Sequence, residues 1–294
     1  MRRFASITVL AAALLASFLP SWPAYGWGNR GHELICEMAF QELSDAARRE
    51  VKRLIRLDPE FGTFARSCTW PDHEPKKRPD EHYVNLPRDA ERVESANCGE
   101  APRCVLSALA DDADQLSRTT SDRRKLELIK YLGHWVGDVH QPFHVSFADD
   151  RGGGRIHELG DACRGEQTLH RVWDVCLVEE GVLEGGVRQT ARRLLAGVSR
   201  EERRRWRRST PVEWADESFQ IVRREEVGYC TLAEDGCRYE THAPRAPERG
   251  ALRPERGFLV DDTYLELHAP VAKERIQQAA VRLAAMLDRL LNSR

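Results

Sequence analysis

A stripe of apolar side chains in the middle of the chain predicts one long helix, which constrains the fold more than any other segment. The apolar residues recur at helical spacing; they are Leu128, Leu132, Trp135, Val136 and Val139. Ser121 can cap the first turn. Pro142 has no N–H to bond the carbonyl of Asp138, so the helix should kink or end there.

Helical periodicity also covers much of the remaining chain. Residues 31–57 should form two helices, with Ser44 as an N-cap between them. Further helices are expected at 104–118, 166–180, 186–197, 211–227 and 268–291. The segments 58–103, 149–165 and 228–262 are rich in turn formers, and loops of such length are usually functional. With no internal repeat and no strand-rich block, we expect a mainly α, single helical domain with long functional loops.

The first 26 residues form a separate segment. Arg2 and Arg3 precede an apolar run from Phe4 to Leu19, and small residues near Gly26 suit a signal peptidase. This pattern predicts a signal peptide at 1–26 and a mature domain at 27–294. A membrane anchor is the alternative, but the run is short for a span of about 20 residues. We therefore expect a secreted or periplasmic protein with no stable membrane association after cleavage.

The chain has eight cysteines, none in a CxxC zinc pattern. In an exported protein, an even number of cysteines favours disulfides. Proximity in the sequence suggests the pairs Cys98–Cys104 and Cys230–Cys237. The remaining four cysteines could pair as Cys36–Cys68 and Cys163–Cys176, for which the sequence gives weaker support.

The formal net charge is −2, with 31% charged and 41% hydrophobic residues. This composition is that of a soluble, globular protein. A nucleic-acid binder that relies on overall attraction is usually basic. Any polyanion bound by this chain must therefore be held at a local site.

Histidine and aspartate pairs suggest what such a site contains. His134 and Asp138 are four residues apart, so both lie on one face of the predicted helix. His144 follows Pro142, and an imidazole and carboxylate with a second imidazole nearby is a metal-ligand arrangement. A single pair would more often be a surface ion pair. His170 and Asp174 repeat the spacing on another helix, which favours metal.

Further candidate ligands lie upstream, at His32, Asp72 and His82. The fragment HELIC around His32 lacks the second histidine of a zincin motif. Neutral imidazoles with carboxylates suit zinc best, although the spacing does not exclude manganese or iron.

The order of motifs WGxxGH, WxDx, HYVN, HxxxDxxQPxH, GGxxI and LHxxWD, from Trp27 to Asp174, resembles a known family. The family comprises the single-strand-specific zinc nucleases of the S1/P1 type and is related to the zinc phospholipases C. The resemblance implies three zinc ions. One would bind Asp72, His82, His134 and Asp138, and a second would bind His144, His170 and Asp174. The third would bind His32, Asp138 and the α-amino nitrogen and carbonyl oxygen of Trp27.

The resemblance also implies an activity. The protein would hydrolyse single-stranded DNA and RNA to 5′-phosphorylated products, with Asp72 orienting the attacking water. It would also act on 3′-nucleotides, and we expect a monomer. A zinc phospholipase C is an alternative, which requires an apolar membrane-facing surface or a lipid-binding domain. A non-enzymatic zinc-binding protein is the third possibility.

Three residues are candidates for substrate binding. Tyr83 could stack on a base, or it could pack in the core. Asn85 stands where fungal members of the family carry an aspartate that recognises the base edge. Those members also carry an arginine where this chain has Pro75, and Lys76, with the basic residues after it, could supply the phosphate-binding charge instead. A solvated charged face is the alternative for this run.

The glycines at 152–154 could let the backbone approach a ligand, or they could form a flexible loop. Five histidines have no match in the family pattern and are expected at the surface or as helix caps. They are His73, His140, His157, His242 and His268.

Overall fold

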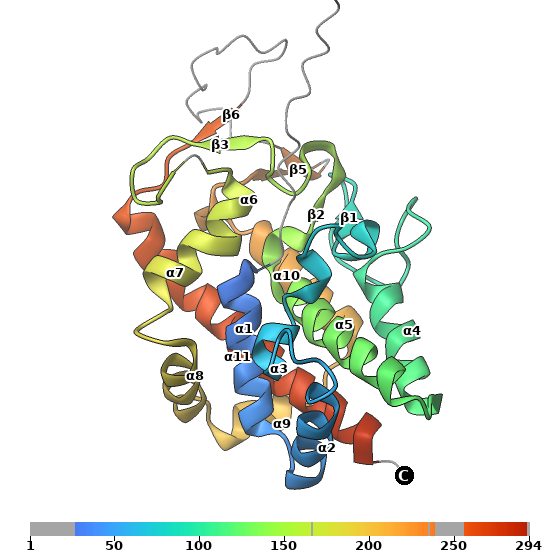
Figure 1. Cartoon of the computed structure of the whole chain (residues 1–294). Helices are drawn as coiled ribbons and strands as arrows, with labels where there is room; N and C mark the ends of the chain where they lie inside the picture. The colour runs from blue at the N-terminus through green and yellow to red at the C-terminus, as the bar shows by residue number, and fades with distance from the viewer. Residues whose placement is uncertain (1–26, 166, 235, 239–255, 293–294) are drawn as a thin grey trace, which may run out of the picture.

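The computed structural model describes residues 27–165, 167–234, 236–238 and 256–292 (Figure 1). The predicted signal peptide and His242 lie outside the described residues. The described part is mainly helical, and its strands occur only as short pairs. The prediction of a mainly α fold is confirmed.

The N-terminal helices follow the sequence prediction closely. Helix α1 spans Asn29–Glu42 and α2 spans Asp45–Ile55. Between them the Ser44 hydroxyl accepts a hydrogen bond from the Ala47 N–H at 3.3 Å. This side-chain cap satisfies one of the amides that a helix start leaves without a partner.

Helix α5 (Asp122–His140) lies at the centre of the domain, with Ser121 as its N-cap. It packs against α1, α2, α4 (Val105–Arg118), α10 (Pro211–Val222) and α11 (Asp262–Asn292). Every residue of α5 from Leu128 to His140 is buried. A helix buried on all sides must satisfy its polar side chains internally. The histidines and aspartate of this segment therefore need partners from other elements.

The C-terminal helix is longer than predicted. We expected it at 268–291, but α11 begins at Asp262 and continues through Pro270. Its first turns bury Tyr264, whose hydroxyl accepts a hydrogen bond from the Trp173 Nε1–H at 3.0 Å. Figure 1 shows α11 crossing the domain beside α1 and α5, and packing contacts join it to both.

The predicted loop region at 58–103 contains short elements. These are α3 (Phe64–Ser67), the 3₁₀ turns η1 (Trp70–Asp72) and η2 (Pro79–Glu81), and strand β1 (Val84–Leu86). Strand β1 pairs in parallel with β2 (Val145–Phe147), which follows the turn η3 (Pro142–His144). The pairing of Val84 with Val145 places the preceding residues, Tyr83 and His144, at the same end of the pair. It therefore joins this loop region to the end of α5.

The rest of the chain surrounds these elements. The predicted helix at 166–180 is divided into α6 (Leu169–Arg171), a π-helical turn η5 (Val172–Cys176) and α7 (Leu177–Gly181). Then follow α8 (Val187–Ala196), α9 (Arg200–Trp206) and the turn η6 (Glu225–Val227). The turn η4 (Ala148–Asp150) precedes β3 (Ile156–Glu158), which pairs in parallel with β6 (Arg256–Phe258). Strands β4 (Thr231–Ala233) and β5 (Gly236–Arg238) are antiparallel.

All eight cysteines form disulfides, in the pairs predicted from the sequence. The Cys36–Cys68 bridge joins α1 to the end of α3, and Cys163–Cys176 joins the irregular segment before α6 to η5. Among the described helices, none has a stretch both long and apolar enough to cross a membrane.

Candidate metal centre

The fold brings the predicted ligand side chains into three buried groups. In each group the potential ligand atoms lie within 4.8 Å of one another. The groups are His32, His134 and Asp138; Asp72, His82 and His134; and His144, His170 and Asp174. Because His134 belongs to two groups, these two form one continuous cluster.

Helix α5 supplies the shared centre of this cluster. Both oxygens of Asp138 face histidines, with Oδ2 3.1 Å from His82 Nδ1 and 3.3 Å from His134 Nε2. Its Oδ1 lies 3.4 Å from His32 Nε2 and 3.5 Å from His144 Nδ1. A carboxylate with this many imidazoles around it is well placed to bridge metal ions.

Two glycines of α5 allow other groups to approach this helix. A Cβ at Gly137 would lie 2.6 Å from the Nδ1 atom of His32, and a Cβ at Gly133 would collide with the Cys36–Cys68 disulfide. The His32 ring stacks on His134 with centroids 3.9 Å apart. Sequence analysis missed both glycines, although their spacing of four residues in GHWVGD places them on one helix face.

Backbone carbonyls orient the imidazole rings. The Nδ1 atoms of three rings lie within hydrogen-bonding distance of carbonyl oxygens: His134 with Cys68 at 2.8 Å, His144 with His82 at 2.6 Å, and His170 with Gly152 at 2.7 Å. An Nδ1–H that donates to the carbonyl leaves Nε2 free to ligate, a common arrangement at metal sites. In His82 the two ring nitrogens exchange roles. Its Nε2 lies 3.0 Å from the Lys77 carbonyl, which leaves Nδ1 facing the cluster.

The glycine loop approaches the third group closely. Gly152 has a φ of +60°, and a Cβ there would collide with the carbonyl oxygen of Phe143. Only a residue without a side chain fits this backbone conformation at such a distance. Of the two readings of residues 152–154, the structure favours close approach, because the Gly152 carbonyl lies 2.7 Å from Nδ1 of the candidate ligand His170.

Gln141 is a further site residue that sequence analysis did not single out. It is fully buried, its side-chain amide donates a hydrogen bond to Asp174 Oδ1, and its Oε1 accepts one from the Phe143 N–H at 2.5 Å. It thus joins the turn after α5 to the third group. The signal for Gln141 in the sequence was its place before Pro142 in the motif HxxxDxxQPxH.

Trp27, the first residue of the described chain, lies beside the same group. Its side chain is fully buried, and the next residue, Gly28, donates a backbone hydrogen bond to the Asp174 carbonyl at 2.8 Å. A Cβ at Gly31 would lie 2.7 Å from the Trp27 Cβ, so the tryptophan packs directly on the first turn of α1.

The protonation states suit metal binding. Burial, together with the charge of His134, lowers the pKa of His32 to about 4. Burial also lowers the pKa values of His82 and His144. Although burial alone would raise the pKa of Asp138, the neighbouring charges of His134 and His144 outweigh it and hold that pKa well below its ordinary value. These shifts favour an ionised Asp138 beside neutral rings of His32, His82 and His144.

Two rings behave differently. Burial opposes the protonation of His134, but the charges of Asp138 and Asp72 outweigh it, so the pKa of His134 is raised. The carboxylate of Asp174 raises the pKa of His170 in the same way, against the effect of burial. At both rings the neighbouring carboxylates favour a positive charge.

The residues present fit a metal ion on a second ground. A buried polar atom normally has a hydrogen-bond partner, and one without a partner is costly. In the cluster, both ring nitrogens of His32, both oxygens of Asp138 and Nε2 of His170 have none. Metal ions would supply partners for atoms of this kind.

The basic residues after Pro75 point in different directions. Lys76 faces the cluster, with its ammonium 3.0 Å from Asp72 Oδ1. Lys77 instead donates to the carbonyls of Pro75 and His73, and Arg78 donates to Asp112 at 2.6 Å. Only Lys76 of this run is therefore positioned to meet a ligand at the cluster.

The other candidate substrate residues lie beside the metal-binding groups. Tyr83 directly follows His82, and Asn85 lies in β1 opposite Ser146; both side chains are half-buried. Burial and the nearby Asp80 charge raise the pKa of Tyr83. His73 is exposed and His157 half-buried. The expectation of a surface or capping role is wrong for His140 and His268, which are buried in the core by α11.

A mainly helical, disulfide-bridged domain with a buried cluster of histidines and aspartates is the arrangement of a protein built to bind metal. Comparison with known families makes this specific. The family model described as S1/P1 Nuclease matches residues 27–292, so the chain belongs to the S1/P1 nuclease family and is a nuclease.

Curated relatives agree over nearly the whole chain. Endonuclease 2 of Arabidopsis thaliana is 29% identical over 280 residues, which cover 90% of this chain and 91% of the relative. Endonuclease 3 of Arabidopsis thaliana is 28% identical over 286 residues, covering 91% and 90%. Nuclease S1 of Aspergillus oryzae is 26% identical over 289 residues, covering 90% and 91%.

Proposed function

We propose that this nuclease is an exported, monomeric, trinuclear zinc enzyme that hydrolyses single-stranded DNA and RNA to 5′-phosphorylated products and also removes phosphate from 3′-nucleotides. The main support is the cluster of buried ligand atoms without hydrogen-bond partners. Nine residues would hold the three ions: Trp27, His32, Asp72, His82, His134, Asp138, His144, His170 and Asp174.

Zinc would supply a Lewis acid for the phosphate and would lower the pKa of a coordinated water to roughly 7. The chain's own residues set the geometry. Carbonyls of Cys68, His82 and Gly152 hold three imidazoles in position. Asp72, buried beside His134, would orient the attacking water by accepting a hydrogen bond from it.

Substrate contacts would come from the rim of the cluster. The Lys76 ammonium, 3.0 Å from Asp72, would pair with a phosphate oxygen. Tyr83 would stack on a base, a contact worth about 1–3 kcal/mol. The Asn85 amide offers both donors and acceptors, so it would accept more than one base edge.

One set of assays separates this function from its alternatives. Protein starting at Trp27 is incubated with single-stranded DNA, RNA, a 3′-nucleotide and phosphatidylcholine. Cleavage of the first three supports the nuclease proposal. Cleavage of phosphatidylcholine alone would establish a phospholipase C, and zinc binding without any hydrolysis would establish a binding protein.

Removal of metal is expected to abolish hydrolysis of single-stranded DNA. Because the ligand atoms are buried and lack protein partners, the chain offers nothing that replaces the ion. After treatment with a chelator, zinc should restore activity better than magnesium, whose preferred ligands are oxygens. Full activity in a preparation shown to be zinc-free by elemental analysis would contradict the proposal.

Lys76→Met is expected to lower kcat/KM on single-stranded DNA by about 10- to 100-fold, because a hydrogen bond to a charged group contributes about 1.5–3 kcal/mol. Lys77→Met is the matched control, since its ammonium contacts backbone carbonyls away from the cluster. Steady-state kinetics of both variants provide the measurement. Equal effects of the two substitutions would mean that Lys76 does not bind the phosphate.

A further inference from the structure

The last turn of α5 is held by residues outside that helix. Pro142 prevents the helix from continuing, so its final carbonyls lack helical N–H partners. The Ser218 hydroxyl, from α10, donates to the Val139 carbonyl at 2.6 Å. The Arg275 Nε–H, from α11, donates to the His140 carbonyl at 3.2 Å. Two neighbouring helices therefore fix the end of α5.

The side chain of His140 is part of the same arrangement. It is fully buried, with Nδ1 2.7 Å from the Val136 carbonyl and Nε2 2.8 Å from an Arg282 nitrogen. Since a guanidinium only donates, Nε2 must accept and Nδ1 must carry the proton. Burial, aided by the charges of Arg275 and Arg282, holds the pKa of His140 well below its ordinary value.

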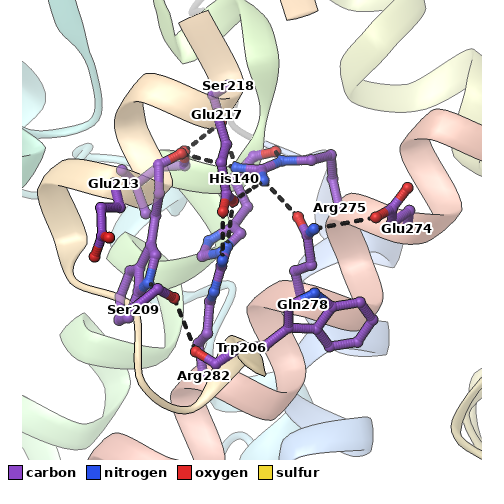
Figure 2. A network of polar contacts seen from close by, with 12 residues as sticks. His140, Trp206, Ser209, Glu213, Glu217, Ser218, Glu274, Arg275, Gln278 and Arg282 are labelled. Carbon is purple, nitrogen blue, oxygen red and sulfur yellow. Dashed lines mark hydrogen bonds and ion pairs between the residues drawn. The ribbon is translucent and has the colours of Figure 1, made fainter. Parts of the chain in front are cut away.

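Glu217 of α10 joins the two arginines. Its Oε2 accepts from Arg275 at 2.5 Å and from Arg282 at 2.6 Å, and its Oε1 accepts from Arg282 at 2.7 Å. Arg275 and Arg282 are seven residues apart, so they lie on one face of α11. Figure 2 shows this network, with Glu217 and Arg282 joined by two contacts and His140 between the helices.

Other groups also contact the network, among them Gln278, which accepts a hydrogen bond from Arg275, and Trp214, whose ring lies against Arg282. Arg275 also donates to the Trp214 carbonyl at 2.9 Å and to the Ser218 hydroxyl at 2.7 Å. The Glu217 side chain is 37% exposed and lines a cavity of about 620 Å³ between α9, α10 and α11. Both arginines are nearly inaccessible, at 2% exposure each. Glu217 is therefore the main carboxylate that balances two buried positive charges.

We propose that Glu217, acting through Arg275 and Arg282, is a positioning residue for the metal centre. The inference rests on the proposed metal-dependent function. The network donates hydrogen bonds to the carbonyls of Val139 and His140, which lie directly after Asp138 and shortly before His144. It thereby sets the direction in which both side chains enter the cluster. Partners hydrogen-bonded to metal ligands contribute in this way, and their loss costs about 10- to 100-fold in metal affinity or activity. Here the contact is made through the backbone next to the ligand Asp138.

Glu217→Gln tests the proposal, because it keeps the shape of the side chain and removes the charge that orders both arginines. Zinc affinity is measured by competition with a chelator, and the geometry of the site by the absorption spectrum of the cobalt(II)-substituted protein. We expect an affinity loss of about 10-fold or more, an altered cobalt spectrum, and a lower kcat with an unchanged KM. Glu213→Gln is the control, since this exposed glutamate lines the same cavity and its carboxylate instead accepts hydrogen bonds from Thr210 at the start of α10.

Ser218→Ala provides a second variant that leaves the ion pairs in place. It removes the hydrogen bond to the Val139 carbonyl, and should alter the cobalt spectrum in the same direction. If Glu217→Gln does not fold, the zinc affinity and cobalt spectrum of Ser218→Ala alone test the inference. Wild-type zinc affinity, spectrum and kcat in the folded variants would overturn the inference and leave the proposed function intact. A wild-type protein that binds no zinc would contradict both the proposed function and the positioning role of Glu217.

Discussion

Asp138→Asn is expected to release zinc and to lower turnover on single-stranded DNA by more than about 100-fold, beyond the loss usual for groups outside the ligand set. The substitution preserves shape but removes one charge and replaces one oxygen by an N–H₂ donor. The Asp138 oxygens lie 3.1–3.5 Å from nitrogen atoms of four imidazoles. Whichever oxygen becomes the N–H₂ group, that group will lie beside proposed ligand nitrogens and cannot itself bind a cation. Elemental analysis and kinetics on the same preparation provide the measurement.

Asp122→Asn is the matched control for this prediction. Asp122 begins the same helix and pairs with Arg53 at 2.6 Å, at the end of α5 opposite to the cluster. It should keep its zinc and its turnover. Similar losses in both variants would indicate damage to the helix as a whole, and Asp138 would then not be the bridging ligand.

A single glycine added before Trp27 is expected to remove one of the three proposed zinc ions and nearly all activity. A free α-amino group has a pKa near 8 and can be neutral when a metal ion binds. The amine and carbonyl of one residue can then chelate a single ion. In the extended protein the same nitrogen is an amide, which has no lone pair available for a metal. Trp27 is fully buried beside Asp174, so little room remains for a different arrangement.

The comparison for this second prediction is between protein that starts at Trp27 and the same protein with the extra glycine. Zinc content and hydrolysis of single-stranded DNA should both fall in the extended form, with circular dichroism unchanged. The result would also mean that the precursor is nearly inactive until the predicted signal peptide is removed. Three bound zinc ions and an equal rate in the extended protein would show that Trp27 only packs beside the cluster.

Local patterns predicted the parts of this protein that depend on neighbours in the chain. The caps at Ser44 and Ser121, and the pairs formed by His134 with Asp138 and His170 with Asp174, follow from helical periodicity. The four disulfide pairings followed the order of the cysteines along the chain. Such features need only a few residues to be specified, so they are visible in the sequence alone.

Contacts between distant segments decided the rest. The carbonyl that orients His134 belongs to Cys68, which is 66 residues away, and Arg282 meets His140 across 142 residues. No periodicity encodes such pairs, so His140 was expected at the surface or as a cap although it is buried. Likewise, Lys76 and Lys77 are adjacent, yet only Lys76 faces the cluster. The order of residues along the chain indicated which residue types could bind metal, and it placed the pairs His134 with Asp138 and His170 with Asp174 on helices. Tertiary packing decided which ring nitrogen faces the cluster and what holds it there, because these depend on backbone groups that only the folded chain brings close.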